Sequence, residues 1–195
     1  MKSVSLLALC LSLASLPIAA TCLCLDDGDS DVRFEVTQDG SPFEGRFHRF
    51  GGKVCFDGTR VTSVDIWLSP ASVDTGLAEL DEVLQGPDLF DTATHPRATF
   101  VSNEIRAEAG HQIATGPLTI KGITHQRAVT LTVRTEGELR IVQGEITFPR
   151  LDYEVGVGEW ADTVLLRDQV TIRFRGRLAR ATRAEAPART SPPDP

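Results

Sequence analysis

Four histidines are the residues best suited to bind a metal ion or to act as a base near neutral pH. They are His48, His95, His111 and His125. No two of them have the HxH, HxxxH or HExxH spacing that places two imidazoles on one face of a strand or helix. His95 follows two acidic residues closely, Asp88 and Asp91. We expect no metal centre, because its ligands would have to come from distant segments.

Other patterns that are typical of active sites are missing from the sequence. It contains no GxSxG motif, and Gly156-Val157-Gly158 lacks the third glycine of a dinucleotide-binding loop. The acidic clusters at 26–29 and 79–82 lack the spacing of a calcium loop. A carboxylate pair for glycoside hydrolysis is defined by its separation in space, so the sequence leaves that chemistry open. We expect a protein that is not an enzyme.

The first twenty residues have the pattern of a secretory signal peptide. A basic start at Lys2 precedes an apolar run from Val4 to Ala20, which Pro17 and several serines interrupt. Such a run is short for a membrane span, and Ala19-Ala20 supplies the small residues that a signal peptidase requires. We expect cleavage near Ala20 and a periplasmic or secreted protein, with an uncleaved membrane anchor as the alternative.

Three of the four cysteines, Cys22, Cys24 and Cys55, remain after the expected loss of residues 1–20. An oxidising compartment favours one disulfide, between Cys55 and either Cys22 or Cys24. The alternatives are free thiols, lipidation of Cys22, and metal binding at Cys22-Leu23-Cys24. The residues before Cys22 make a poor lipobox, and a single intervening residue is an unusual spacing for metal ligands.

The charge of the mature chain is acidic. Removal of residues 1–20 leaves 19 basic residues against 27 acidic ones, a net charge of −8. The basic residues are scattered along the sequence and are not interleaved with aromatic ones. This balance argues against nucleic acid or an anionic membrane surface as the partner.

Hydrophobic residues alternate with polar ones from residue 31 onward, which is the pattern of strands with one buried face. The series Val170, Ile172, Phe174 is the clearest example, and Val32, Phe34 repeats it near the start. Short turn sequences separate the candidate strands and favour an antiparallel meander. Further strand candidates are 43–50, 53–57, 61–68, 97–108, 111–121 and 138–148.

We expect one or two short helices, and residues 77–85 are the clearest candidate. Leu77, Leu80, Val83 and Leu84 would share its apolar face, Asp74 or Thr75 is a candidate N-cap, and Gly86-Pro87 ends it. Because a helix this short is marginal alone, it should pack against the sheet. We expect a lead-in at 21–28, one domain at 29–178, and a disordered tail rich in alanine and proline at 179–195.

Large apolar residues fall on the faces of the strands and connections that are expected to point inward. They allow two interpretations, a filled core or a barrel with an apolar lumen for a chain-like ligand, and periodicity does not separate these. The lumen candidates are Phe34, Phe47, Phe56, Ile66, Leu68, Phe90, Phe100, Leu118, Ile120, Leu131, Phe148, Ile172 and Phe174.

Several sequence pieces in a fixed order carry a family resemblance. The most specific are SVDTG at 72–76, DLFD at 88–91, HPRATF at 95–100 and GPLTIKGIT at 116–124. Together they resemble the YceI-like family of lipocalin-like β-barrels that hold polyisoprenoid lipids. The match runs from about residue 29 to residue 178.

The resemblance implies an all-β, antiparallel, lipocalin-like β-barrel that sequesters or carries a long-chain isoprenoid lipid and needs no other cofactor. The head group would lie at the rim of the barrel. An isoprenoid quinone as ligand would make the protein an accessory to electron transfer with an envelope redox or membrane protein as partner. An enzyme that acts on lipid or glycan at the barrel mouth and a packed interaction module are two competing interpretations, and dimerisation through an outer face stays open. The rim candidates are His95, Arg97, Arg150, Tyr153 and Trp160.

Overall fold

The computed structural model describes residues 21–25, 30–137 and 139–179. Twelve strands, one α-helix and three short 3-10 helices occur among these residues. The strands are β1 Thr21–Leu25, β2 Asp31–Gln38, β3 Ser41–Phe47, β4 Phe50–Asp57, β5 Arg60–Leu68, β6 Val73–Asp74, β7 Ala98–Val101, β8 Glu104–Glu108, β9 His111–Ile120, β10 Ile123–Glu136, β11 Leu139–Pro149 and β12 Leu166–Ala179. The helices are α1 Ala78–Gln85, η1 Pro70–Ser72, η2 Arg150–Tyr153 and η3 Gly158–Ala161.

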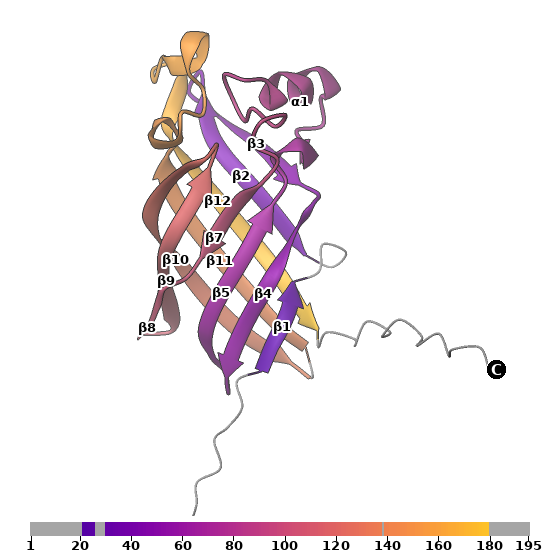
Figure 1. Cartoon of the computed structure of the whole chain (residues 1–195), viewed down its shortest axis with the longest axis vertical. Coiled ribbons are helices and arrows are strands. Elements are labelled where there is room, and N and C mark those ends of the chain that lie inside the picture. The colour runs from indigo at the N-terminus through magenta and orange to yellow at the C-terminus, as the bar shows by residue number, and fades with distance from the viewer. Residues whose placement is uncertain (1–20, 26–29, 138, 180–195) are drawn as a thin grey trace, which may run out of the picture.

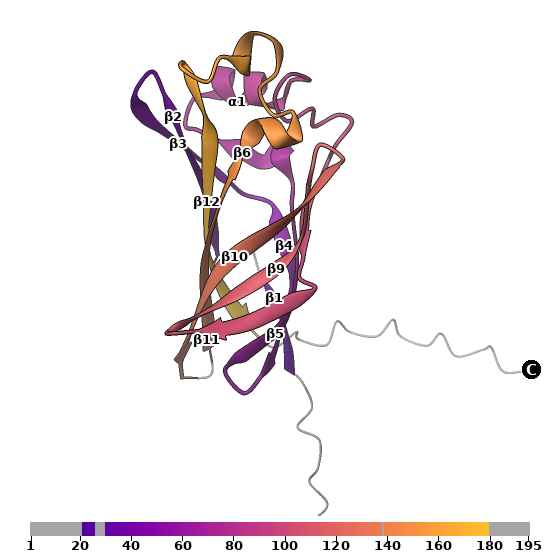
Figure 2. The ribbon, with the colours of Figure 1, turned by 90° about the vertical axis from the view of Figure 1, so that its left-hand side faces the viewer.

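The strands form a closed antiparallel barrel with eight positions around the ring. On one side, β1 and β2 both pair with β12. On the other side, β1 pairs with β4 and β2 pairs with β3. From β4 the ring continues through β5, β7, β9, β10 and β11 back to β12. Figures 1 and 2 show these strands wrapping around one axis at a slant. The predicted single-domain, antiparallel β-barrel is confirmed.

The barrel forms because the alternating residues of adjacent strands match in register. Val170 lies opposite Val36 and Ile172 opposite Phe34, so the apolar sides of β12 and β2 face the interior together. A shift of one residue would turn these side chains to the solvent, and the register is therefore strongly specified. Closure leaves no long free edge along the ring.

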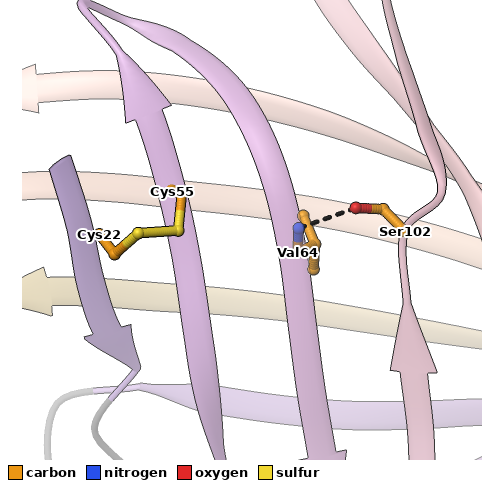
Figure 3. The surroundings of a disulfide bond; sticks show 4 residues. All are labelled: Cys22, Cys55, Val64 and Ser102. Carbon is orange, nitrogen blue, oxygen red and sulfur yellow. Dashed lines mark hydrogen bonds between the residues drawn. A yellow bond between two sulfur atoms is a disulfide. The ribbon is translucent and has the colours of Figure 1, made fainter. Parts of the chain in front are cut away.

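β1 belongs to the barrel wall, although residues 21–28 were expected only as a lead-in. The Cys22–Cys55 disulfide joins β1 to β4, and Cys24 is free (Figure 3). One of the two predicted pairings of Cys55 is therefore present. The expected signal peptide at 1–20 lies outside the described residues, and so does the expected tail apart from Ala179.

The prediction of a single strand over 97–108 is wrong. The chain breaks between β7 and β8, where the hydroxyl of Ser102 accepts a hydrogen bond from the backbone N–H of Val64 at 2.8 Å (Figure 3). Similarly, the strand predicted at 43–50 divides between β3 and β4. At the first break the Ser102 side chain thus bonds the backbone of β5, 38 positions away in the sequence.

α1 lies over one end of the barrel, here called the capped end (Figures 1 and 2). Its predicted N-cap is wrong, because Leu77 occupies that position without a side-chain cap. The side chain of Asp81 instead accepts hydrogen bonds from the N–H and hydroxyl of Thr75. The predicted apolar face is wrong in part, since Leu77 is 64% exposed and Val83 44%. Leucines one turn apart carry the packing, with Leu80 partly buried and Leu84 buried.

The segment 150–165 covers the capped end beside α1 (Figure 1). The carbonyl of Asp88 accepts hydrogen bonds from the N–H groups of Gly156 and Val157. The ammonium group of Lys121 donates to the carbonyls of Pro87, at 3.0 Å, and Glu154, at 2.7 Å. These bonds tie the two covering segments to each other and to the turn between β9 and β10. In the part of the chain that the structure describes, no helix has the length and apolar character needed to span a bilayer.

Candidate functional site

Two apolar chambers lie within the described barrel, one behind the other along its length. The upper chamber, beneath the capped end, has a cavity volume of about 100 Å³, and the lower chamber one of about 110 Å³. Both are several times larger than the roughly 10–15 Å³ that a single water requires. Leu68, Ala98, Phe148 and Ile172 line both chambers and form a waist between them.

Side chains from the wall and from both covering segments line the upper chamber. β2 and β3 contribute the aromatic group Phe34, Phe43 and Phe47. α1 and the residues after it close the top with Leu84 and Phe90. The remaining lining residues are Val36, Gln38, Leu68, Pro70, Leu80, Leu89, Ala98, Ile120, Phe148, Arg150, Val155, Trp160, Leu166, Val170 and Ile172.

The lower chamber is lined by aliphatic and aromatic side chains around the whole ring. Its described lining includes Thr99 but no charged residue. Beyond the waist, it consists of Leu25, Val32, Phe50, Val54, Val64, Ile66, Trp67, Thr99, Phe100, Leu118, Val129, Leu131, Val142, Ile146, Phe174, Gly176 and Leu178.

The structure places twelve of the thirteen lumen candidates on these two linings. Phe34, Phe47, Phe90 and Ile120 line the upper chamber alone. The lower chamber alone has Ile66, Phe100, Leu118, Leu131 and Phe174, while Leu68, Phe148 and Ile172 belong to the waist. Phe56 lies outside both chambers: it is 1% exposed and packs beneath the guanidinium of Arg140, 4.6 Å from the ring centroid.

Three of the five rim candidates, His95, Arg97 and Tyr153, are absent from both chamber linings. Nε2 of His95 lies 3.7 Å from Oδ2 of Asp91. Arg97 lies on the ring of Trp67, with its guanidinium carbon 4.5 Å from the ring centroid. Neither residue contributes to a chamber lining. The alternation of side chains along a strand explains why Arg97 lies outside the lumen, because the next residue, Ala98, points inward at the start of β7.

Arg150 is a buried cation at the top of the upper chamber, with 2% of its surface exposed. All five of its N–H groups donate to backbone carbonyls. Burial lowers the pKa of the guanidinium, and the negative charge of Asp168 opposes this shift. An arginine nevertheless stays protonated near neutral pH. The five accepting residues are Val155, Gly156, Trp160, Leu166 and Arg167.

Trp160 and Tyr153 complete the set of rim candidates. Trp160 lines the upper chamber, and its backbone carbonyl accepts from Nη2 of Arg150 at 2.8 Å. Tyr153 is fully buried behind Phe148, with the two ring centroids 5.3 Å apart. Arg150 and Trp160 are thus the rim candidates in contact with the lumen.

Three of the four histidines lie beside a carboxylate, and none of the four is on a chamber lining. His48 is hydrogen-bonded to Asp74 at 2.7 Å, and this bond, followed by one from the N–H of Gly76, lowers the pKa of Asp74. His111 lies 3.2 Å from Glu108. Neither chamber lining includes a histidine or a carboxylate, and no group of three metal-ligating side chains occurs among the described residues. The arrangement is suited to hold an apolar molecule.

Sequence reasoning missed Gln38, a polar residue of the upper chamber. It continues the inward series Val32, Phe34, Val36 at the end of β2. Every second residue of this series is apolar and points inward, and Gln38 occupies the next inward position. A polar residue at such a position was the signal that could have identified Gln38 as a lumen residue. The α1 residues Leu80 and Leu84 were also missed as lumen residues, because a helical period does not show which cavity a helix covers.

Comparison with known proteins gives concordant results. BcnA of Burkholderia cenocepacia is 34% identical and has a TM-score of 0.76, with 80% of this chain and 99% of that chain covered. The protein YceI of Escherichia coli O157:H7 is 34% identical over 110 residues, 55% of this chain and 56% of that protein. This chain spans only about half the length of such curated relatives.

A more distant structure has the same fold. The polyisoprenoid binding domain from Saccharophagus degradans is 17% identical, with a TM-score of 0.61 over 84% of this chain and 99% of that one. The family model of the YceI-like domain matches residues 24–178 of the sequence. These residues include the whole closed barrel apart from the first residues of β1 and the last residue of β12. The chain therefore belongs to the YceI-like family.

Proposed function

We propose that this protein is an exported, non-catalytic carrier that sequesters a long-chain isoprenoid lipid in the two chambers. The observation that carries the proposal is the predominantly apolar lining of two chambers that share Leu68, Ala98, Phe148 and Ile172. A chain-like ligand fits such a lumen better than a compact one. The fold shared with a polyisoprenoid binding domain supports this choice of ligand class.

Exclusion of water provides the affinity in this mechanism. Each methylene that moves from water into the chambers contributes roughly 0.8 kcal/mol, so a long tail binds without specific polar contacts. An apolar cavity lined by aliphatic and aromatic groups stays dry and accepts apolar molecules. Such a lumen discriminates weakly between tails of similar length.

Export to the periplasm or the exterior is part of the proposal. The signal-like residues 1–20 support it, and so does the Cys22–Cys55 disulfide, since disulfides persist in oxidising compartments. A carrier outside the cytoplasm would keep a poorly soluble lipid dispersed between membranes. If the bound lipid is a quinone, the protein would serve isoprenoid-quinone electron transfer.

Native mass spectrometry of the mature protein, purified from a cell envelope without added lipid, tests the proposal. We expect a stoichiometric long-chain adduct that organic extraction releases and identifies as an isoprenoid. An empty protein that also fails to take up added prenyl lipids would contradict the carrier function. The extract distinguishes a quinone from other isoprenoids.

A matched pair of variants locates the ligand. Ala98 is 7% exposed and lines both chambers, so Ala98→Phe should fill the waist and abolish the adduct. Val101, on the same strand, is 44% exposed, and Val101→Phe should leave the adduct unchanged. Circular dichroism and thermal unfolding of both variants would show that the barrel is intact. Equal lipid content in the two variants would place the ligand outside the lumen.

A further inference from the structure

A single short strand pairing closes the ring of the described barrel. The sheet runs from β1 through β4 and around to β12, where β12 meets β1 again. That pairing consists of two residue pairs, Cys24 with Ala179 and Leu25 with Leu178. Among the described strands, neither β2 nor β3 pairs with β4, so β1 alone joins the lower part of β4 to β12. Figure 1 shows β1 as a short strand toward the end of the barrel opposite α1.

β1 also fills the wall with two leucines. Leu23 is 4% exposed and belongs to the packed core, and Leu25 lines the lower chamber. Gly176 makes room for Leu25, since a Cβ on residue 176 would collide with Cδ1 of that leucine. If β1 leaves the wall, both leucines leave with it. The lower chamber then opens to solvent between β4 and β12.

The Cys22–Cys55 disulfide is the covalent link between β1 and β4 (Figure 3). The leucines of β1 point inward, so Cys22 lies on the outer face of the wall, where it is exposed to solvent. Exposed disulfides are among those that thiols reduce readily, whereas protected structural ones resist reduction. This disulfide is therefore accessible, and it fixes the strand on which closure of the ring depends.

We propose that the Cys22–Cys55 disulfide is a redox site for an external dithiol, and that its reduction frees β1 and opens the lower chamber for ligand exchange. The release of β1 follows from the topology of the wall alone. The exchange of ligand rests on the proposed function.

The reaction is a thiol–disulfide exchange in two steps. A thiolate of the dithiol attacks Sγ of Cys22, the S–S bond breaks, and Cys55 leaves as a thiolate that takes up a proton. The second thiol of the dithiol loses its proton and attacks the mixed disulfide, which releases Cys22 as a thiolate that is protonated in turn. Two electrons pass to the protein, and the dithiol ends as its own disulfide.

Amide hydrogen exchange of the mature protein tests the release of β1. Dithiothreitol should raise the exchange rate of residues 21–25 and 52–56 at least about 10-fold, because a cross-link of this kind shifts an opening equilibrium by more than one order of magnitude. The increase should be smaller in β9, whose protection shows that the rest of the barrel stays folded. Cys55→Ser should exchange like the reduced protein without dithiothreitol. Cys24→Ser, which removes the free thiol, is the matched control and should behave as the wild type does.

Transfer of a preloaded probe tests the opening of the chamber. A radiolabelled long-chain prenyl alcohol is bound to the oxidised protein, which is then mixed with an excess of phosphatidylcholine vesicles. We expect transfer to the vesicles to be at least about 10-fold faster with dithiothreitol, since the same equilibrium is shifted. Cys55→Ser should release the probe at the fast rate in both conditions, and Cys24→Ser should again match the wild type.

The two measurements separate this inference from the function on which its last step rests. If residues 21–25 exchange equally in the oxidised and reduced protein, the disulfide does not hold β1 and the inference is overturned. If β1 exchanges faster but the probe leaves at an unchanged rate, the opening of the chamber is wrong and the carrier function stands. If neither form binds the probe while β1 still exchanges faster on reduction, the carrier function fails and the redox control of β1 is supported.

Discussion

Gly156 and Arg150 fit together only because residue 156 has no side chain. A Cβ at this position would lie 2.2 Å from Nη1 of Arg150, the nitrogen that donates to the carbonyl of Gly156 at 2.7 Å. The backbone of Gly156 also has a φ of +80°, in the left-handed region. The contact therefore requires glycine on both steric and conformational grounds.

Gly156→Ala should destabilise the protein. The left-handed backbone costs a non-glycine residue about 1–2 kcal/mol, and displacement of the guanidinium adds to this cost. We expect the free energy of unfolding to fall by about 2–4 kcal/mol, measured by urea denaturation. Gly110→Ala has a similar φ of +79° but no atom within 4 Å of the new Cβ, so it serves as the control for backbone strain alone. Equal losses in the two variants would show that the contact with Arg150 is unimportant.

The disulfide should stabilise the closure of the barrel. Cys22 and Cys55 are separated by 33 residues, and a cross-link over a loop of this size contributes about 2–4 kcal/mol. Cys22→Ser should lower the free energy of unfolding by this amount, and dithiothreitol should lower that of the wild type similarly. Cys24→Ser should have little effect, because Cys24 is free. A large loss in Cys24→Ser with none in Cys22→Ser would assign the bond to Cys24.

Phe174 lies against Gly144 on the neighbouring strand, and a Cβ at residue 144 would be 2.3 Å from the Cζ atom of the ring. Gly144→Ala should push this ring and destabilise the protein by about 1–3 kcal/mol. Phe174→Leu in the same chain should recover part of the loss. The double-mutant cycle should give a coupling of at least about 0.5 kcal/mol, and strict additivity would contradict the contact.

The sequence predicted the wall of the barrel better than its ends. Alternation at Val170, Ile172 and Phe174 is a local property, and it identified β12 without knowledge of its neighbours. The same reasoning failed at Leu77, because the solvent exposure of a capping helix depends on what lies beneath it. It also failed at Ser102, where a side-chain contact with a residue 38 positions away breaks the strand.

Candidate lumen residues were predictable, but the surroundings of Arg150 were not. Inward alternation placed Phe34 and Ile172 on chamber linings, whereas Phe56 is inward and packed without facing a chamber. A period of two distinguishes inside from outside but not a cavity from a filled layer. The environment of Arg150 depends on carbonyls as far along the chain as Arg167, which no local pattern shows.

Tyr153 allows the burial of the segment 150–165 to be measured directly, because it is the one tyrosine in the sequence. Its side chain is fully buried, and its hydroxyl has no hydrogen-bond partner among the described residues. Burial raises the pKa of Tyr153, while the positive charge of nearby Arg127 opposes part of this shift. The neutral phenol is thus the form that the folded protein favours.

The sign of the pH dependence follows from that raised pKa. The preference of the folded protein for the neutral phenol stabilises it fully below pH 10, about the pKa of a tyrosine in the unfolded chain. This contribution is lost as the pH rises through the pKa of Tyr153 in the folded protein. Phenolate absorbance near 295 nm should therefore titrate above pH 10 in the native protein and near pH 10 in urea. Tyr153→Phe should unfold less readily than the wild type above pH 10. At neutral pH it should be equally stable or up to about 1 kcal/mol more stable, because a buried hydroxyl without a partner is removed. A native titration at the unfolded pKa would mean that the segment 150–165 opens to solvent.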